Sequence, residues 1–549
     1  MVITSYLYYN LRVEVFRMSN KKQNKKGKRN YSRTIDLFFL MFLLIFMIGA
    51  FYIAFSFRIL PKKWILIAAL VFAILFVILF LLSMKRLPTW ALVIKRVFIV
   101  LLCAALGISG YFLNKTSSTI KKVSSTGTEV TTQKMMVLVS KDSTITSVDQ
   151  LSTALVGFQT GTDQENAAYI KQQLSKQVSN YQIVEESDYT TLVDALINTK
   201  TIQAMAISES YYKMSAANID GFTDSVKELV SYEKTVQPVQ ASTKDITKET
   251  FTVYLSGLDN MGSPDQVTRT DTNLILIVNP IAKHIDMVSL PRDGYMPNTA
   301  LNNLNDKLTH TGNFGVQTSV STIEDFFGID IDFYARVSFN SLIEIVDTIG
   351  GIDVDVEIDF CEQDENRSFE QDDLVCLTKG EQHLNGKQAL AYSRHRYTFG
   401  YDNAGRERAQ QRIIKAIINK MISPSALGYL DSLLNIIPNY VITNVSSNQI
   451  QDFVSSELEE ASNWTISSIT SDTGVYDDQV AASTADMGTS DCYLFSQEEV
   501  QALLNAYDGA SNQLQLNTFS FDLNDLYKDC PALNTDPNIV WDYEAVNPH

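Results

Sequence analysis

The sequence predicts a membrane-anchored α/β protein, in which a small α/β module precedes a larger domain with a central mixed β-sheet flanked by helices. Three observations lead to this prediction. Long apolar runs follow the N-terminus, short apolar strands alternate with helical patterns over the rest of the chain, and charge divides sharply between these two parts. Alternation of strands and helices is typical of α/β folds. With 549 residues, the chain is long enough for two or three domains.

Three apolar runs predict the membrane anchor. They cover residues 37–57, 64–84 and 90–113. Each is close to the roughly 20 residues that a spanning helix needs. The basic N-terminus and the basic loop 85–96 are expected in the cytoplasm, because positive charge stays on that side of a membrane. Three spans then place everything after residue 113 outside the cell membrane.

Charge separates the anchor from the rest of the chain. Residues 1–113 hold 16 lysines and arginines against 2 acidic residues, a net charge of +14. The other 436 residues hold 29 against 60, a net charge of −31. We expect no nucleic acid partner for this acidic part, because such binding depends on neutralised phosphates. The basic arm adjoins a span, so lipid headgroups are its expected partner.

The composition and pattern predict six segments. They are a basic cytoplasmic N-terminus (1–36), three transmembrane helices (37–113), a Ser/Thr-rich linker (114–133), an accessory α/β module (134–245), a larger domain (250–507) and a C-terminal tail (508–549). Within the module, the expected strands are 136–140, 155–159, 181–185 and 203–207, and the expected helices are 163–177 and 189–198.

Three strands of the larger domain are expected to gather polar residues at one sheet edge. They are the apolar runs 251–255, 274–278 and 285–290. If these strands run up, down and up, Asp259, Asp271, Arg292 and Asp293 meet where the first strand ends, the second begins and the third ends. Polar residues crowded at the edge of an apolar sheet usually mark a site. The alternative is ordinary turn chemistry.

Arginines form a second cluster within residues 391–412. Arg394 and Arg396 are spaced i, i+2, so in an extended segment both side chains point to one face. A helix is expected to begin near Gly405, with Asp402 or Asn403 as its cap.

Within that helix, Arg406 and Gln410 share the face that Ile413 and Ile417 bury. A basic residue in the first turn opposes the helix dipole. An anion held between the helix N-terminus and a fork of arginines would account for it. The alternative is a solvated basic helix face paired with nearby carboxylates.

Four cysteines lie beyond the apolar runs: Cys361, Cys376, Cys492 and Cys530. The first two flank an acidic, turn-like stretch, and cysteines of exported domains tend to pair. We expect a Cys361–Cys376 disulfide. No cysteine or histidine spacing indicates a zinc site.

Six blocks of residues together resemble the LytR-CpsA-Psr family over about residues 251–507. They are Gly257-Leu-Asp259, Arg269-Thr-Asp-Thr-Asn273, Ser289-Leu-Pro-Arg-Asp293, Asn305-Asp-Lys307, Ser393-Arg-His-Arg396 and Gly405-Arg-Glu-Arg-Ala-Gln410. Three spans and an accessory module resemble the capsule-biosynthesis branch. The resemblance implies an enzyme that transfers a glycopolymer, such as capsular polysaccharide or a teichoic-acid-like polymer, from a polyprenyl-diphosphate carrier to peptidoglycan.

The residue types agree with this chemistry, because arginine forks bind diphosphate oxygens better than lysine does. The candidate diphosphate ligands are Arg292, Lys307, Arg394, Arg396, Arg406 and Gln410, and the four arginines would also stabilise developing charge. Asp259 and Asp271 would repel a diphosphate unless Mg²⁺ (or Mn²⁺) lies between them, so they are the expected metal ligands. Asp402 or Asp293 is the expected general base.

The lipid tail needs an apolar channel. Phe326, Phe327, Phe333, Tyr334 and Ile343 could help to line it, or they could simply be core.

The accessory module resembles one lobe of an extracellular solute-binding protein but shows no convincing ligand set. We expect it to tune the larger domain or to bind another wall-assembly protein, with a spacer as the alternative.

Three other functions stay open. A polyprenyl-diphosphate hydrolase would use the same site with water as acceptor. A membrane-bound regulator of capsule or wall gene expression is favoured only by the basic N-terminus, which shows no helix-turn-helix pattern. A polymer-binding scaffold would not need clustered arginines and aspartates.

Overall fold

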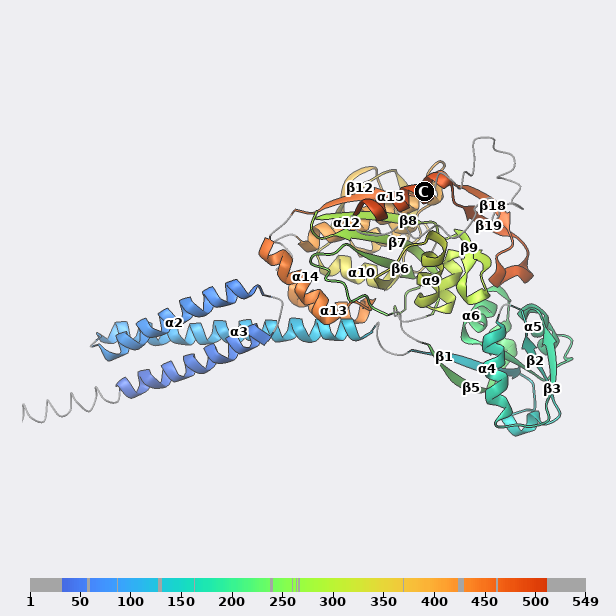
Figure 1. Cartoon of the computed structure of the whole chain (residues 1–549), viewed down its shortest axis with the longest axis horizontal. Helices are drawn as coiled ribbons and strands as arrows, with labels where there is room; N and C mark the ends of the chain where they lie inside the picture. The colour runs from blue at the N-terminus through green and yellow to red at the C-terminus, as the bar shows by residue number, and fades with distance from the viewer. Residues whose placement is uncertain are drawn as a thin grey trace, which may run out of the picture. The chain divides into compact units, whose positions relative to one another are not determined.

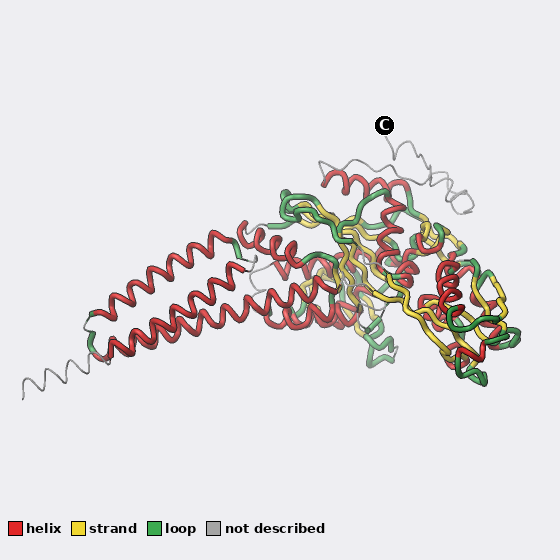
Figure 2. The backbone as a smooth tube through the Cα atoms, turned by 60° about the horizontal axis from the view of Figure 1, so that its bottom comes forward, coloured by secondary structure: helices red, strands yellow, loops and turns green. Residues whose placement is uncertain are grey.

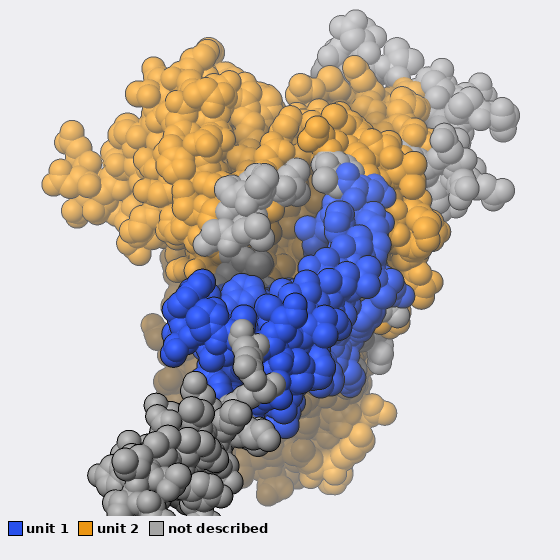
Figure 3. Space-filling model, turned by 90° about the vertical axis from the view of Figure 1, so that its left-hand side faces the viewer, with its two compact units in different colours: residues 1–118, 450–461 blue, residues 119–449, 462–549 orange. Residues whose placement is uncertain are grey.

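The computed structural model describes residues 32–56, 60–85, 87–126, 131–161, 163–236, 240–258, 260–262, 264, 267–368, 370–422, 429–460 and 463–510. The chain divides into two compact units (Figure 3), one of Met1–Ser118 and Ile450–Ala461 and one of Thr119–Gln449 and Ser462–His549. The segment predicted as accessory module falls in the second unit, and so does the predicted larger domain except for residues 450–461. Most of the expected tail, from residue 511 on, lies outside the described residues.

The first unit contains three helices that are long and apolar enough to cross a membrane. They are Ser32–Ser56, Lys62–Met84 (α2) and Thr89–Ser124, the last within α3 (Thr89–Thr126). The prediction of three apolar helices is confirmed, and Figure 2 shows them as long red coils. Buried Asp36 of the first helix accepts hydrogen bonds from Lys95 Nζ at 2.6 Å and Arg96 Nε at 2.7 Å, so an ion pair joins the first helix to α3.

The predicted linker from residue 114 is wrong up to Thr126, where α3 ends. Hydroxyl side chains bond to carbonyls of the preceding turn there, as in Thr116 Oγ1 to Phe112 O at 2.9 Å. Such back-bonding satisfies the hydroxyl groups within the helix, so a Ser/Thr-rich sequence is compatible with it.

The second unit begins with a five-stranded sheet in the order β3-β2-β4-β1-β5 (Figure 1). Its strands are β1 (Thr131–Ser140), β2 (Leu155–Gln159), β3 (Gln182–Glu186), β4 (Ala204–Ser208) and β5 (Val226–Val236), and its helices are η1 (Val148–Leu151), α4 (Gln164–Ser175), α5 (Tyr189–Ile197), α6 (Glu209–Asn218) and α7 (Phe222–Ser225). β2 is parallel to β3 and β4, whereas β1 is antiparallel to β4 and β5. The strands and helices predicted for this module are confirmed.

A six-stranded mixed sheet follows, in the order β16-β11-β6-β7-β8-β17. Its strands are β6 (Phe251–Leu258), β7 (Thr270–Asn279), β8 (His284–Leu290), β11 (Phe333–Ser338), β16 (Ile442–Thr443) and β17 (Thr465–Ile469). β6, β7 and β8 run antiparallel to one another, β11 is parallel to β6, and β17 is parallel to β8. The predicted mixed sheet and its up, down, up order are confirmed.

Helices cover both faces of this central sheet. On one face, α9 (Val316–Phe327) and α15 (Gln497–Ala510) pack against Ile275 and Leu290 in the largest apolar cluster. On the other face lies α12 (Asp402–Ile422), whose Gln411 Nε2 donates to Ser289 Oγ at 2.8 Å. Successive strand residues point to opposite faces, so Ser289 and Leu290 separate the two layers.

Further short elements lie between residues 295 and 494. They are β9 (Tyr295–Asn298), η2 (Thr299–Leu301), β10 (Leu304–Lys307), α8 (Leu308–Thr311), η3 (Gly312–Phe314), α10 (Phe339–Thr348), β12 (Ile352–Val356), β13 (Phe360–Glu362), β14 (Val375–Leu377), β15 (Gly380–Leu384), α11 (Gly386–Arg394), α13 (Leu430–Tyr440), α14 (Ser447–Glu460), β18 (Val475–Gln479), η5 (Ala482–Met487) and β19 (Ser490–Leu494).

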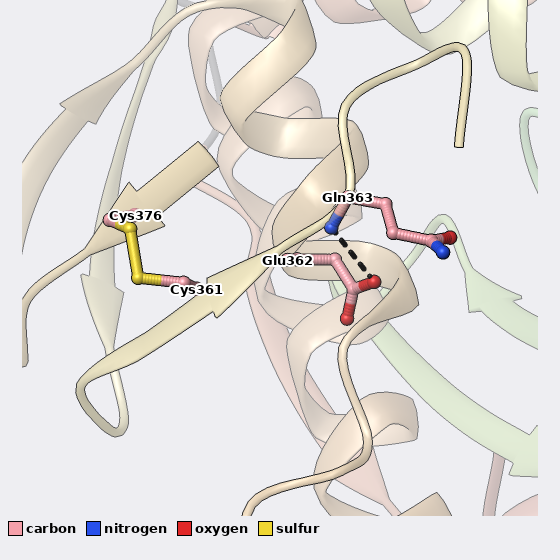
Figure 4. Close-up of a disulfide and its surroundings, with 4 residues drawn as sticks. All are labelled: Cys361, Glu362, Gln363 and Cys376. Carbon is pink, nitrogen blue, oxygen red and sulfur yellow. Dashed lines mark hydrogen bonds between the residues drawn. A yellow bond between two sulfur atoms is a disulfide. The ribbon is translucent and has the colours of Figure 1, made fainter. Parts of the chain in front are cut away.

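A disulfide joins Cys361 to Cys376, as predicted. The two cysteines face each other across the β13–β14 hairpin (Figure 4), with their Cα atoms 4.0 Å apart. Cys492 is a buried free thiol in β19. Cys530 lies outside the described residues.

Candidate active site

The central sheet brings three of the four predicted edge residues together. In its ladder, Leu258 of β6 lies opposite Thr270 of β7, and Asn273 lies opposite Leu290 of β8. Asp271 and Arg292 therefore meet just beyond this edge, with Arg292 Nη1 2.7 Å from Asp271 Oδ1. The fourth residue, Asp259, lies outside the described residues.

Lys307 extends the cluster of charges. It ends β10, and its Nζ lies 3.3 Å from Asp293 Oδ1, while Arg292 Nε lies 3.6 Å from the same oxygen. Buried Asp306 fixes this end of the strand, since its Oδ1 accepts a hydrogen bond from Lys307 N at 2.9 Å. The side chains of Arg292, Asp293 and Lys307 are all largely buried. Their charges are consequently little screened by water.

Arg406 is the most deeply buried arginine of the predicted set, with 6% of its surface exposed. Its Nε has no hydrogen-bond partner among the described residues. Burial lowers the pKa of its guanidinium; Asp271 opposes this effect, and Arg292 and Arg396 add to it, which places all three within electrostatic range. A buried donor without a partner costs stability unless something else binds it, so Arg406 is available to an anionic ligand.

Helix α12 begins at Asp402, so the prediction of a start near Gly405 is wrong by one turn. The cause is Asp402 itself, whose Oδ1 accepts a hydrogen bond from Ala404 N at 3.0 Å and closes the first turn. Gly405 packs against Tyr401: a Cβ there would lie 2.5 Å from the Tyr401 ring. Arg406 and Gln410 share the buried face with Ile413, as predicted.

Arg394 and Arg396 do not form the predicted extended fork, because α11 continues to Arg394. Arg394 Nη1 and Nη2 donate to Asp364 O at 3.1 Å and to Gln363 Oε1 at 3.2 Å. Arg396 instead stacks over the Tyr397 ring at 5.3 Å and lies within electrostatic range of Arg406. Among the predicted arginines, the structure thus groups Arg396 with Arg292 and Arg406.

Gln410 supports this arrangement from α12. Its Nε2 donates to Ser393 O at 3.1 Å, which ties α12 to the end of α11 beside Arg394 and Arg396.

Asp402, one of the two candidate bases, is exposed at the start of α12. Asp293, the other candidate, lies in the charged cluster.

Glu407 is a site residue that the sequence did not single out. It is buried beside Arg406, and burial raises its pKa to about 8 despite the nearby arginine. At neutral pH the carboxyl is therefore mostly protonated and does not cancel the positive charge of the site. Its sequence neighbours gave no signal, because Glu is common on a solvated helix face. Asn403, predicted only as a possible helix cap, donates a hydrogen bond to Tyr476 OH, and Tyr476 was not predicted.

Whether the site can hold a divalent cation depends on which carboxylate oxygens are near one another and still accessible. Among the described residues, no group of three or more histidine, cysteine, aspartate and glutamate side chains could hold a metal ion. Asp271 Oδ1 is occupied by Arg292 and by Thr309 Oγ1, the latter at 3.3 Å. Mg²⁺ binds through one or two carboxylates together with substrate phosphates, so the second oxygen of Asp271 suits a metal that arrives with a diphosphate.

The predicted channel residues belong to the core. Phe326, Phe327, Phe333 and Tyr334 are at most 4% exposed, and Ile343 is also buried. Phe327 alone borders a cavity of about 90 Å³ between β8, β17 and α15. Its apolar lining includes Val288, Leu290, Phe495 and Leu503, and its polar lining includes Glu499.

Comparisons with known proteins agree with the block pattern. The LytR_cpsA_psr family matches residues 215–507, which are 293 of the 549 residues. The polyisoprenyl-teichoic acid–peptidoglycan teichoic acid transferase TagU of Bacillus licheniformis is 34% identical over 213 residues, covering 39% of this chain and 65% of that protein. TagU of Bacillus subtilis is 34% identical over 209 residues, covering 38% of this chain and 64% of that protein.

One solved relative is the crystal structure of Bacillus subtilis TagV, with 24% sequence identity, 49% of this chain and 99% of that chain covered, and a TM-score of 0.40. The family match begins at residue 215, within α6, and so before the predicted boundary at 250. It covers more than half of the chain and confirms the resemblance seen in the six blocks. The chain belongs to the LytR_cpsA_psr family.

Proposed function

We propose that this protein transfers a glycopolymer from a polyprenyl-diphosphate carrier to peptidoglycan. The observation that carries the proposal is the excess of buried positive charge at the sheet edge. Among the described residues, four cations, Arg292, Lys307, Arg396 and Arg406, stand against three carboxylates, Asp271, Asp293 and Asp306, while Glu407 is mostly protonated at neutral pH. Such an excess suits a diphosphate, and the curated relatives named above carry out a polyisoprenyl-linked transfer by name.

In this proposal the arginines hold the diphosphate, with Lys307 beside them and Arg394 and Gln410 in support. An acceptor sugar hydroxyl attacks the phosphorus next to the glycopolymer. The new P–O bond forms as the P–O bond to the carrier phosphate breaks, so polyprenyl phosphate leaves. Asp293 accepts the hydroxyl proton, and it is favoured over Asp402 because it lies within the cluster. The arginines stabilise the charge that develops on the phosphate oxygens.

We further propose that Asp259 and Asp271 hold Mg²⁺ when the substrate is bound. A bound Mg²⁺ would neutralise charge on the phosphate oxygens. The chain's own contribution is to keep Asp271 in place through Arg292 and Thr309. Mn²⁺ has similar ligand preferences and is the alternative ion.

The apolar cavity bordered by Phe327 is the proposed start of the lipid channel. Its polar lining includes Glu499, which is in electrostatic range of Glu407, the neighbour of Arg406. A diphosphate at Arg406 could thus direct its isoprenoid tail between β8 and α15. At about 90 Å³ the cavity holds only the first part of such a tail, so α15 would have to move outward.

The proposed location is the cell membrane, with the N-terminus in the cytoplasm and the active site outside. The support is the basic N-terminus, the basic loop 85–96 and the disulfide, which belongs in an oxidising compartment. The three-span anchor and accessory module favour capsular polysaccharide as the polymer.

The test uses the full-length protein in detergent with a radiolabelled lipid-linked saccharide and soluble peptidoglycan fragments. We expect label to move to the peptidoglycan and polyprenyl phosphate to be released in equal amount. Release of polyprenyl phosphate with free saccharide phosphate, whether or not acceptor is present, would identify a hydrolase and refute the transfer. No consumption of the lipid would refute both.

A further inference from the structure

A second hollow of about 80 Å³ lies in the larger unit, away from the arginine cluster. One wall belongs to α5 and α6 of the accessory module, and the other is the start of η5 from the family region. Helix α6, in the first wall, is also held against other parts of the larger domain. The rings of Tyr211 and Phe314 lie 5.8 Å apart, and Lys213 Nζ donates to Val267 O at 3.1 Å.

The lining of this hollow is rich in hydroxyl groups. Its polar members include Ser187, Asp188, Thr190, Ser215, Ser483 and Thr484. Two tyrosine rings in contact, Tyr189 and Tyr211, border it, with their centroids 4.6 Å apart and their planes tilted by 38°. No lysine, arginine or histidine is among its lining residues in the described part of the chain. An anionic ligand would meet Asp188 with no compensating cation.

We propose that this hollow binds a neutral saccharide unit. Hydroxyl and carboxylate oxygens can exchange hydrogen bonds with sugar hydroxyls, and aromatic rings supply apolar surface with a polar edge. The small volume fits the edge of one sugar ring in a longer chain. The sugar could come from the glycopolymer or from a peptidoglycan strand, and both offer the same chemistry. This binding is independent of the proposed transfer.

The hollow is also connected to the charged cluster. Ser483 Oγ in its wall donates to Asp306 Oδ1 at 3.0 Å and lies 2.9 Å from His310 Nδ1. The same Asp306 oxygen accepts a hydrogen bond from Lys307 N, and Lys307 Nζ pairs with Asp293. A sugar that holds η5 in place would also hold this chain of contacts. When the saccharide has already ordered these contacts, the diphosphate loses less conformational entropy as it binds. Saccharide binding therefore strengthens diphosphate binding. This second part rests on the proposed function.

Binding is tested by calorimetry on the full-length protein in detergent, with chitotetraose and maltotetraose as neutral probes. We expect at least one probe to bind, and the tighter one identifies the source: N-acetylhexosamine strands for chitotetraose and hexose polymers for maltotetraose. Thr190→Lys adds bulk and charge at the exposed rim and should weaken binding at least tenfold. Thr201→Lys, the same change at an exposed position of the module outside the hollow, should leave it unchanged.

Two results would overturn the saccharide site. One is that neither probe binds the wild-type protein. The other is that Thr190→Lys, with a normal melting temperature, binds the probes as tightly as Thr201→Lys does.

The connection is tested with farnesyl diphosphate as the lipid probe. Saturating oligosaccharide should raise its affinity at least threefold in the wild-type protein. In Asp306→Asn, which alters the link at a residue outside the lining of the hollow, the oligosaccharide should still bind but change that affinity less than 1.5-fold. An equal increase in both proteins would overturn the connection. Absence of farnesyl diphosphate binding without oligosaccharide would instead count against the proposed function.

Discussion

Both sheets of the larger unit have buried aspartates near the ends of strands. The two sheets differ in the side chains that offset the cost of burying these carboxylates. In the accessory module, Asp163 accepts hydrogen bonds from Tyr189 OH and Ser208 Oγ, both at 2.6 Å. In the central sheet, Asp271 and Asp293 pair with Arg292 and Lys307. Burial raises the pKa of Asp163, because neutral donors offset only part of the cost of burying a charge.

This difference separates a structural carboxylate from a site that needs a ligand. The hydroxyls around Asp163 satisfy one side chain at the N-terminus of α4. At the central sheet, the cations outnumber the carboxylates, and Arg406 Nε has no partner among the described residues. Excess buried positive charge is costly, so this edge favours an anion whereas the accessory edge does not.

The largest expected effect comes from removing Arg406, whose Nε has no hydrogen-bond partner among the described residues. Arg406→Ala should weaken farnesyl diphosphate binding roughly 10- to 100-fold, equivalent to about 1.5–3 kcal/mol for a charge-assisted contact, and should abolish transfer. The melting temperature should change little, since Arg406 Nε has no hydrogen-bond partner among the described residues to lose. Calorimetry and the transfer assay provide the measurement.

Arg412→Ala is the matched control for that change. Arg412 lies on the same helix, is partly exposed and donates to Asp355 O at 2.7 Å. Its loss should alter diphosphate binding less than twofold. Equal losses in the two variants would show that α12 contributes only general positive charge.

The second prediction contrasts the two kinds of aspartate directly. Asp271→Asn and excess chelator should each reduce transfer at least tenfold, because a carboxylate and a divalent metal are both expected at the diphosphate. Asp163→Asn should retain transfer within threefold, since its partners are neutral hydroxyls and an amide. Transfer that persists in EDTA would exclude the metal, and a loss in Asp163→Asn equal to that in Asp271→Asn would remove the contrast.

The third prediction concerns pH and Glu407. Its pKa is raised from 4.5 to about 8 in the folded protein. Between these values the folded state keeps a proton that the unfolded state has lost, so stability should fall as pH rises from 4.5 to 8. Glu407→Gln should remove this fall and be more stable above pH 8, by on the order of 4 kcal/mol.

Denaturant unfolding at several pH values measures this effect. Glu381→Gln, a change at an exposed position, serves as the control and should keep the wild-type pH dependence. If Glu407→Gln follows the wild-type curve, Glu407 is ionised in the folded protein, and the positive excess at the site is smaller than we infer.

The smallest expected effect is that of the disulfide. Cys361→Ser with Cys376→Ser should lower the free energy of unfolding by about 3 kcal/mol, the value for a loop of about 15 residues. Transfer should fall only severalfold, because the hairpin leads to Gln363 and Asp364, which contact Arg394 but not Arg406. A complete loss of transfer in a folded double variant would mean that Arg394 is as important as Arg406.

The edge of the central sheet could be predicted because strand direction places residues reliably. Continuous apolar runs located β6, β7 and β8, and the polar residues at the end of β6, the start of β7 and the end of β8 had to meet. The arrangement of Arg394 and Arg396 could not be predicted in the same way. It depends on where α11 ends, and helix ends are decided by local hydrogen bonds such as that from His395 N to Ala391 O. Glu407 was missed because only three-dimensional packing distinguishes it from a solvated glutamate.

The most direct test of the central claim is a crystal structure of the protein with a short-chain polyprenyl diphosphate. We predict that the phosphate oxygens lie within hydrogen-bond distance of Arg292, Arg396 and Arg406, and that Arg406 Nε gains a phosphate oxygen as its partner. A diphosphate bound only beside Arg394, or elsewhere on the molecule with Arg406 Nε still without a partner, would contradict the account.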